Sequence, residues 1–342
     1  MRATLLSWFY RSIRRCVLLG TKDLETAITL GDHAYIRLKP LKKWIYHFSI
    51  PKHIGVSLYD LSFPSPLTLA AFKDDPDILH IWMQFGLGGA TIKTLLKEPR
   101  PGNPHPRITE VTTPEGKGLL NAMGLPGKGI SKFIESLPTL TLFSDKKPIG
   151  ISIGGNSLED YQDNFLKLDH ALQTLYPGRY YLELNISCPN TPEGQDLSKN
   201  PTLLEALLRF IRNHSNTIVG VKLSPDQPND TLLTYGKLIA SFPRTYINIG
   251  NTSFRKCDAL GLPSTAISIG GGGLSGPALF KRTLDMTTLL APLGCPIMAT
   301  GGISKPEHVL ALKKKGALLF GLATAVVQDP YCIPKLNRVL VP

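Results

Sequence analysis

Apolar and β-branched residues gather in short runs along the chain, and the segments between them are mostly long enough to hold a helix. Eight such runs follow residue 60, at 67–71, 90–93, 149–153, 181–186, 218–223, 246–249, 296–300 and 318–321. Alternation of short buried strands with helices is typical of an α/β protein with a parallel sheet. Eight repeats predict that the sheet closes into a (β/α)8 TIM barrel. We assign residues 53–342 to this barrel and residues 1–52 to an N-terminal extension.

One interval interrupts the regular alternation. Between the second and third runs the chain carries many turn formers, among them Pro99, Pro101, Gly102, Pro104 and Pro106. Proline and glycine break helices and strands, and loops of this length are uncommon unless they serve a site. The composition therefore predicts an elaborated loop at the barrel mouth over residues 95–130.

The N-terminal extension has the hydrophobic period of a helix. On a helical projection, apolar residues share one face and arginines the opposite one, with Leu5, Leu6, Phe9, Ile13, Cys16 and Val17 on the first and Arg11, Arg14 and Arg15 on the second. A second stretch, at 42–48, is basic and aromatic. Residues 1–52 hold ten basic and three acidic residues, so +7 of the formal net charge of +12 lies there.

Such an extension is typical of a helix that lies on an anionic membrane surface. The charge is not spread over the body, which argues against a nucleic-acid partner. No apolar run approaches the roughly 20 residues that a spanning helix needs, and arginines interrupt the first segment too early for a signal peptide. We expect a peripheral protein on the cytoplasmic side of a membrane. The alternatives are a helix packed on the protein's own body and a soluble cytoplasmic protein.

The five cysteines are scattered and show no CxxC spacing. This distribution argues against a disulfide framework and against a zinc or iron–sulfur site within the chain. We therefore expect no metal and a reducing compartment.

Polar side chains follow most of the predicted strands at the point where each strand ends. They are Lys93, Asn156, Asn185, Cys188, Lys222, Asn248 and Asn251. Parallel barrel strands end at one rim, the C-terminal face, where barrel enzymes place their active sites. Any one of these residues could serve a loop, but together they predict an active site at that rim.

The segment 184–192 is the most informative part of this rim. Asn185 and Asn190 flank Cys188, and two prolines prevent the strand from continuing. A thiol on such a loop can take or give a proton, and a carboxamide supplies an uncharged donor and acceptor that orient a polar ring. The alternative for Cys188 is an inert buried cysteine beside a turn.

Glycines after the last strands indicate a phosphorylated ligand. Gly301 and Gly302 follow the seventh strand, and Ala323 and Thr324 follow the eighth, where barrels commonly bind phosphate through backbone N–H groups. The glycine-rich run 270–276 would form a loop that approaches the same ligand closely. Because no GxGxxG motif opens a βαβ unit, flavin mononucleotide (FMN) fits better than a dinucleotide.

Several motifs together give the chain a specific family resemblance. They lie, in order, at residues 91–94, 102–107, 121–126, 185–190, 220–223 and 299–303. With them, residues 55–330 resemble the dihydroorotate dehydrogenases of de novo pyrimidine biosynthesis. The resemblance implies oxidation of dihydroorotate to orotate with FMN as the hydride acceptor. The sequence leaves the oligomeric state open, with a homodimer as one arrangement.

The same resemblance implies roles for individual residues. Cys188 would be the catalytic base that removes the C5 proton while C6 delivers a hydride to the flavin. The residues implied to bind the substrate are Lys93, Asn121, Met123, Gly124, Leu125, Asn185, Asn190, Asn251 and Thr252. Those implied to bind FMN are Ala71, Lys93, Asn156, Asn185, Lys222, Asn248, Gly276, Gly301, Gly302, Ala323 and Thr324.

Features of two classes of this family are mixed in the chain. Lys93, the 121–126 loop and Cys188 resemble the soluble class 1 enzymes. Three features resemble the membrane-bound class 2 enzymes, which reduce a quinone: segment 190–192, segment 272–277 and the basic extension. We favour a quinone as the electron acceptor, with fumarate or NAD as the alternative.

Phe72 departs from the family pattern. It follows Ala70 and Ala71 at a place where the family usually has a glycine. The larger side chain puts the flavin contact at this position in question.

Three other functions remain as alternatives. A dihydropyrimidine dehydrogenase-like enzyme also uses a loop cysteine, but it usually needs extra electron-transfer domains. A tRNA dihydrouridine synthase would place basic charge on phosphates, yet the charge here lies in the extension. A membrane-docked flavin barrel without turnover would need neither Cys188 nor the asparagines.

Overall fold

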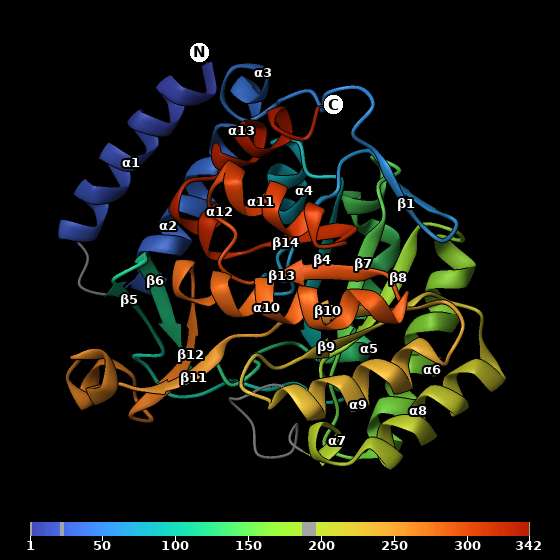
Figure 1. The fold of residues 1–342 in the computed structure, drawn as a ribbon. Helices are drawn as coiled ribbons and strands as arrows, with labels where there is room; N and C mark the ends of the chain where they lie inside the picture. Colours follow the sequence, from blue (N-terminus) through green and yellow to red (C-terminus); the bar gives the residue numbers. More distant parts are fainter. Residues whose placement is uncertain (1, 21–23, 187–195, 342) are drawn as a thin grey trace.

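The computed structural model describes residues 2–20, 24–186 and 196–341, and its centre is a closed barrel of eight parallel strands (Figure 1). In order around the barrel these are β3 (Leu67–Leu69), β4 (Gly89–Leu95), β7 (Ile149–Ile153), β8 (Tyr180–Leu184), β9 (Val219–Leu223), β10 (Thr245–Ile249), β13 (Ile297–Thr300) and β14 (Leu319–Leu322). Each strand overlaps one of the eight predicted runs, so the predicted TIM barrel is confirmed.

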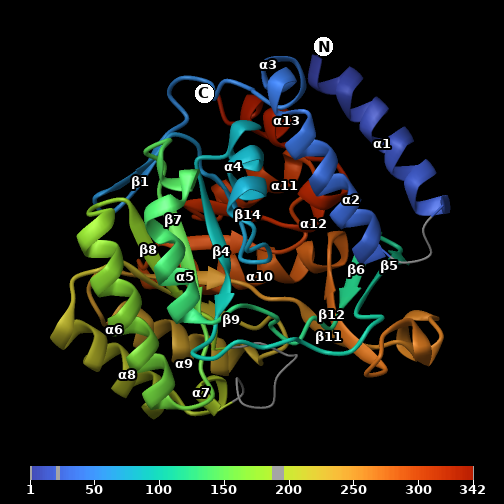
Figure 2. The same ribbon diagram turned by 180° about the vertical axis from the view of Figure 1, so that it is seen from behind.

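Helices surround the barrel (Figures 1 and 2). Outside the N-terminal extension they are α4 (Pro76–Gln84), α5 (Ile130–Ser136), α6 (Leu158–Leu175), α7 (Asp196–Lys199), α8 (Pro201–His214), α9 (Asn229–Ala240), α10 (Phe280–Leu290), α11 (Pro306–Lys314), α12 (Thr324–Gln328) and α13 (Cys332–Arg338). In α8, Leu204, Leu207, Leu208 and Ile211 recur at helical spacing and are fully buried. The Asn200 side chain starts this helix by accepting two backbone hydrogen bonds from its first turn.

Side chains close the N-terminal end of the barrel. Tyr181 and Tyr246 are fully buried there, with ring centroids 5.8 Å apart. A hairpin of β1 (Val56–Leu58) and β2 (Leu61–Phe63) packs against these rings from outside the barrel. Because aromatic side chains fill this end, ligand space is left at the opposite, C-terminal end, where the loops follow the strands.

The interval predicted as one elaborated loop contains regular structure, and that prediction is wrong. Strands β5 (Ile108–Thr113) and β6 (Gly116–Asn121) form an antiparallel hairpin. This hairpin continues through β12 (Gly271–Ser275) and β11 (Ser253–Lys256) into a four-stranded sheet. The sheet lies at one side of the barrel, next to the N-terminal helices, in both ribbon views (Figures 1 and 2).

The glycine-rich run likewise forms a strand and not the predicted loop. A Cβ at Gly272 of β12 would come 2.4 Å from the carbonyl oxygen of Asn121, and one at Gly273 would come 2.1 Å from Oγ1 of Thr252. Glycine is needed here so that a strand can pack closely against its neighbours, which is a packing requirement and not a sign of a flexible turn.

The extension folds as α1 (Arg2–Gly20), α2 (Leu24–Arg37), a short 3-10 turn and α3 (Lys42–Ile45). Figures 1 and 2 show α1 and α2 against the barrel. Ion pairs join these two helices to the body: Arg11 with Asp329, Arg14 with Glu110, Glu25 with Arg107, and Asp32 with Lys73. No helix within the described ranges is both long and apolar enough to cross a bilayer.

The helical projection misplaces Arg14. Its side chain is only 18% exposed and pairs with Glu110 at 2.5 Å, although the projection grouped it with the outward-facing arginines. Leu5, Phe9 and Ile13 of the projected apolar face are instead more than half exposed. One side of α1 therefore packs on the protein's own body, which was the alternative. Phe9 and Ile13 line a cavity between this helix and the body, whereas Leu5 and Trp8 do not line it and are exposed.

Candidate functional site

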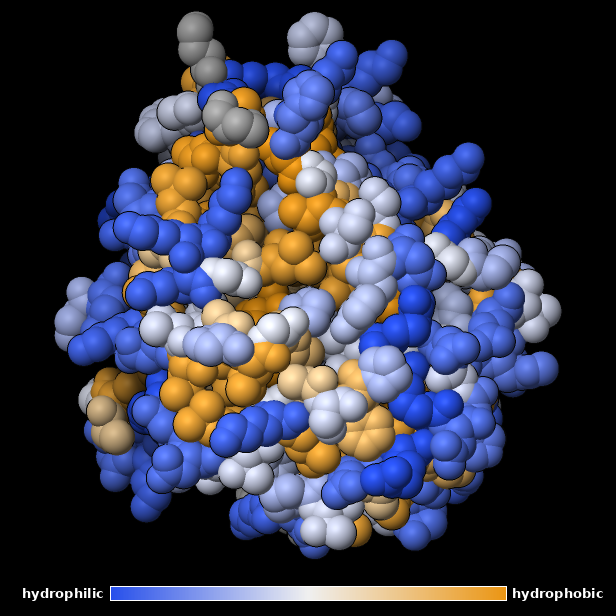
Figure 3. Space-filling view, turned by 45° about the vertical axis from the view of Figure 1, so that its right-hand side comes forward, coloured by the Kyte–Doolittle hydropathy of each residue, from blue (hydrophilic) through white to orange (hydrophobic). Residues whose placement is uncertain are grey.

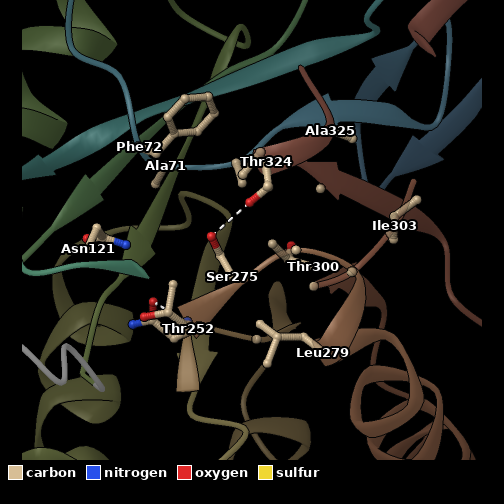
Figure 4. Close-up of a pocket in the computed structure, with 18 of the residues that line it drawn as sticks. Ala71, Phe72, Asn121, Thr252, Ser275, Leu279, Thr300, Ile303, Thr324 and Ala325 are labelled. Carbon is tan, nitrogen blue, oxygen red and sulfur yellow. Dashed lines mark hydrogen bonds between the residues drawn. The ribbon is translucent and has the colours of Figure 1, made fainter. Parts of the chain in front are cut away.

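A pocket lies at the C-terminal end of the barrel, between the barrel strands and the antiparallel sheet (Figure 4). The predicted site residues that line it are Ala71, Lys93, Asn121, Met123, Leu125, Asn185, Lys222, Asn251, Thr252, Gly276, Gly301, Gly302, Ala323 and Thr324. They come from many separate strand ends and from the sheet. The structure thus brings most of the predicted set to one rim, as strand direction in a parallel barrel requires.

Three predicted residues do not line this pocket. Gly124 lies beside the Asn103 side chain. Asn156 is exposed, and its backbone N–H donates to a carboxylate at the start of α6. Asn248 turns into the barrel interior, where Glu183 accepts its amide hydrogen bond.

Two further predicted residues, Cys188 and Asn190, lie outside the described residues. The described structure therefore gives no position for the predicted base. Asn185, three residues before Cys188, does line the pocket.

Amide side chains at the pocket are held in fixed orientations by their neighbours. Asn185 donates from Nδ2 to Oγ1 of Thr94 at 2.8 Å, and its Oδ1 accepts from Nδ2 of Asn251 at 3.3 Å. The Oδ1 of Asn251 accepts from the backbone N–H of Thr252 at 2.9 Å. Across the pocket, Asn121 donates to a backbone carbonyl of β12 at 3.2 Å. These bonds fix which amide atoms remain directed at a ligand.

Two lysines supply positive charge to the same pocket. Lys93 lies at a register irregularity in β4, and its Nζ donates to the carbonyl oxygen of Pro126 at 2.9 Å. Burial lowers the pKa of Lys93 below its ordinary value, and the Asp74 carboxylate opposes this shift. Lys222 is 6% exposed at the end of β9. A buried lysine and a partly buried one favour an anionic ligand or one on which negative charge develops.

Below the pocket, the barrel holds buried polar atoms that lack protein partners. Glu183 is fully buried, and its Oε2 accepts from Asn248 at 2.7 Å and from the Tyr246 hydroxyl at 3.1 Å. Within the described part of the chain, Oε1 of Glu183, Oδ1 of Asn248 and Oγ1 of Thr300 have no hydrogen-bond partner. Buried polar atoms without a partner are rare, so these atoms indicate a bound ligand or ordered water.

The far end of the pocket is built from backbone with little side-chain bulk. Gly276, Gly301 and Gly302 have φ angles of 104°, 137° and 71°, which favour glycine. The Thr324 hydroxyl donates to Oγ of Ser275 at 2.8 Å, the dashed line in Figure 4. Backbone N–H groups and hydroxyls around a glycine-rich turn suit a phosphate group.

Sequence reasoning missed several lining residues. They include Thr94, Gly250, Ser275, Leu279, Thr300, Ile303, Ser304, Gly321, Ala325 and Gln328. The strand-end rule that found Lys93 could also have found Thr94 and Thr300. Ile303 and Leu279 carry no polar signal, so only the fold reveals them.

A second, apolar cavity of about 340 Å³ lies between the N-terminal helices and the barrel. Its lining combines residues of α1 and α2 with the body, chiefly Leu6, Phe9, Tyr10, Ile13, Val17, Leu24, Ala27, Ile28, Ala34, Tyr35, Leu38, Ile45, Trp82, Val326, Val327 and Tyr331. The hydroxyl of Tyr35 is buried and finds no partner among the described residues. The helical projection did not predict this cavity, because it cannot show that α1 and α2 pack around a space.

Comparison with known proteins supports a single family. The sequence model of the dihydroorotate dehydrogenase family matches residues 53–341. The dihydroorotate dehydrogenase (quinone) of Chloroflexus aurantiacus is 29% identical, over 97% of this chain and 96% of its own length. The catalytic subunit of dihydroorotate dehydrogenase B (NAD(+)) of Bacillus thuringiensis is 33% identical, over 84% of this chain and 90% of its own.

Solved structures agree with the fold. The crystal structure of a ligand-free dihydroorotate dehydrogenase from Eimeria tenella superposes with a TM-score of 0.77, at 18% identity, covering 91% of this chain and 93% of that one. The relatives include both quinone-linked and NAD-linked types, so likeness alone does not choose the electron acceptor. The family match over nearly the whole barrel shows that this chain belongs to the dihydroorotate dehydrogenase family.

Proposed function

We propose that this protein oxidises dihydroorotate to orotate with FMN in the pocket, as a step of de novo pyrimidine biosynthesis, and passes the electrons to a quinone. The observation that carries the proposal is the pairing of two spaces. A polar pocket with amides, two lysines and a glycine-rich end lies next to an apolar cavity under the N-terminal helices.

The pocket suits FMN at both of its ends. Gly276, Gly301, Gly302 and Thr324 would hold the phosphate, because backbone there approaches the ligand without side-chain bulk. Lys222 would lie beside the ring, where its buried charge stabilises negative charge on the reduced form. When bound, FMN supplies the hydride acceptor. Ala71 and Ala323 would also contact it, as the family resemblance implies.

Dihydroorotate would bind among the amides. Its ring carries alternating C=O and N–H groups, which Asn121, Asn185 and Asn251 can match with donors and acceptors already oriented by their own hydrogen bonds. Lys93 would pair with the substrate carboxylate. Cys188 remains our proposal for the base that takes the C5 proton. Its thiol must be deprotonated to do so, and an ordinary thiol pKa of about 8.5 means the rate rises with pH unless the site lowers that pKa.

The apolar cavity favours a quinone over fumarate or NAD as the acceptor. A quinone ring and its isoprenoid tail are apolar and fit a lining of aliphatic and aromatic side chains. The unpartnered Tyr35 hydroxyl can donate to a quinone carbonyl, and Arg14 also lines the cavity. Fumarate and NAD are strongly charged, and burying them in this lining would be costly.

The outer surface of the extension fits a peripheral position on an anionic membrane. Trp8 is 65% and Trp44 74% exposed, and Arg15, Lys42 and Lys43 are exposed as well. On the face of the molecule drawn in Figure 3, apolar side chains form an irregular band between hydrophilic ones. Exposed aromatic side chains beside basic ones are typical of proteins that lie on a bilayer surface. Sedimentation with anionic vesicles should therefore fall in the double variant Trp8→Glu, Trp44→Glu.

Anaerobic oxidation of dihydroorotate tests the proposal. The purified protein should be yellow, dihydroorotate should bleach it, and a short-chain quinone should restore the colour faster than fumarate or NAD. A colourless protein that does not take up FMN contradicts the cofactor assignment. Recovery of colour with fumarate or NAD, but not with a quinone, would support the class 1 alternative. Bleaching by dihydrouracil, but not by dihydroorotate, would support a related dihydropyrimidine oxidoreductase.

A further inference from the structure

Two aromatic rings form part of the wall between the pocket and the apolar cavity. Phe72 lines the pocket, and Trp82 of α4 lines the cavity. Their rings stack with centroids 5.5 Å apart and planes at 30°. Figure 4 shows the Phe72 ring at the edge of the pocket, next to Ala71. One side-chain pair therefore has one member in each space.

The short helix α12 forms another part of the same wall. Ala325 and Gln328 line the pocket, whereas Val326 and Val327 line the cavity. Since successive residues of a helix point to different sides, the helix separates the two spaces over its length. The helix and the ring pair thus each contribute residues to both linings.

The segment that carries Phe72 is held on both sides. The Phe72 N–H donates to the carbonyl oxygen of Ala70 at 2.9 Å, and the carbonyl oxygen of Lys73 accepts from the N–H of Lys93 at 2.9 Å. The Lys73 side chain pairs with Asp32 of α2, which itself lines the cavity. The ring position is thus fixed by β4 on one side and by the extension on the other.

The size of the side chain at position 72 decides whether the wall is closed at this point, because Phe72 lines the pocket and stacks on a residue that lines the cavity. A glycine would leave the volume of a phenyl ring open between the two spaces. Phe72 fills that volume, and Trp82, which is 5% exposed, supports its ring from behind. A well-packed aromatic pair resists displacement, because stacking adds to the burial of both rings.

We propose that Phe72 is a specificity-determining residue that sets how far a quinone in the apolar cavity extends toward the pocket, and so which headgroup the cavity accepts. This inference rests on the proposed quinone acceptor. With the ring in place, the inner end of the cavity fits a one-ring benzoquinone better than a two-ring naphthoquinone. Removal of the ring opens space for the larger headgroup.

Binding can be measured without turnover. In the double variant Trp8→Phe, Trp44→Phe, Trp82 is the only tryptophan left, and quinones bound in the cavity should quench its fluorescence. A short-chain benzoquinone and a naphthoquinone with the same tail are titrated in the absence of dihydroorotate. The quantity compared between variants is the ratio of the two dissociation constants.

Phe72→Ala should shift this ratio toward the naphthoquinone by roughly tenfold or more, the scale of discrimination that one apolar group gives in a pocket. Phe72→Leu, which keeps more volume, should shift it in the same direction by less. Phe9→Ala is the matched control, because Phe9 lines the cavity from α1 but does not line the pocket. It should weaken both quinones to a similar extent and leave the ratio as in the parent.

The outcomes separate this inference from the proposed function. If the parent binds both quinones but neither Phe72 variant changes the ratio, Phe72 does not set headgroup choice. If Phe9→Ala changes the ratio as much as Phe72→Ala, selection is not located at the wall and the inference is also overturned. If neither quinone quenches the fluorescence of Trp82 with Phe72 in place, and the protein reduces neither quinone, the quinone assignment itself fails.

Discussion

Asp329 anchors the N-terminal helix to the barrel, and its removal should release that helix. The Asp329 side chain is only 4% exposed. Its Oδ2 accepts from the hydroxyl of Ser7 at 2.5 Å and from Arg11 at 2.9 Å, and Lys335 lies 3.7 Å away. Two of these three partners are in α1 and the third is in α13. The Asp329→Ala variant should therefore weaken docking of α1 on the body.

The size of the effect follows from burial. The Arg11 side chain is 66% exposed, so solvent screens its ion pair, which contributes about 1 kcal/mol or less. The hydrogen bond from the Ser7 hydroxyl is buried and its acceptor is charged, so it contributes about 1.5 to 3 kcal/mol to the docking free energy. A loss of about 2 kcal/mol in docking free energy would raise the undocked population of α1 roughly 30-fold.

Limited trypsin digestion measures that population, because cleavage at the arginines of α1 requires local opening and follows the open fraction when reclosing is fast. Cleavage after Arg11 and Arg14 should accelerate by roughly 10-fold to 30-fold in Asp329→Ala. Asp163→Ala removes an exposed carboxylate of α6 that pairs with Lys97, and should leave the cleavage rate as in the parent. Equal cleavage of the parent and Asp329→Ala would refute the view that Asp329 holds α1 in place.

Three further predictions concern the site and the core. Cys188→Ala should slow flavin reduction by dihydroorotate by roughly 10²-fold or more while FMN stays bound. Cys188→Ser should keep part of the rate, with its pH dependence shifted to higher pH. Turnover of the alanine variant at the parental rate would contradict the assignment of Cys188 as the base. Lys93→Met should weaken orotate binding by roughly 10-fold to 100-fold, measured from the change in the flavin spectrum, and unchanged affinity would remove Lys93 from the carboxylate site. Burial raises the pKa of the Cys332 thiol to about 12, so this group favours the folded state below its unfolded pKa and loses that contribution as pH rises toward 12. The free energy of unfolding, measured with a denaturant, should therefore fall between pH 9 and 11, and the fall should be shallower in Cys332→Ala than in the parent by about 1.4 kcal/mol per pH unit. Equal slopes in the two proteins would contradict this account.

The barrel strands could be predicted because their signal is local. A strand buried on both faces is a continuous apolar run, and the turn formers on either side of it set its length. The position of the site followed from topology alone, since parallel strands that end in polar residues deliver them to one rim. Lys93, Asn185 and Lys222 lie together in the pocket for that reason.

The hairpin of β5 and β6 could not be predicted with the same ease. Its strands are largely polar and only half buried, and prolines precede it, so composition indicated a loop. Its partner β12 consists mostly of glycine, which has low strand propensity and adopts a strand here because neighbouring backbones approach closely. The position of Asn248 outside the pocket lining could not be predicted for a related reason: its amide donates to the buried Glu183 carboxylate, 65 residues earlier in the chain.

The extension is bound to the same segments that form the site, which changes how its role must be tested. Arg14 pairs with Glu110 in β5, Glu25 with Arg107 in the loop beside the pocket, and Asp32 with the residue after Phe72. Deletion of residues 1–50 would therefore open the apolar cavity and loosen the pocket wall at the same time as it removed any membrane contact. Lost quinone activity in such a deletion would not separate these causes. Substitutions that place a charge at exposed positions such as Trp8 leave the ion pairs in place and change only the exposed surface that we propose contacts the membrane.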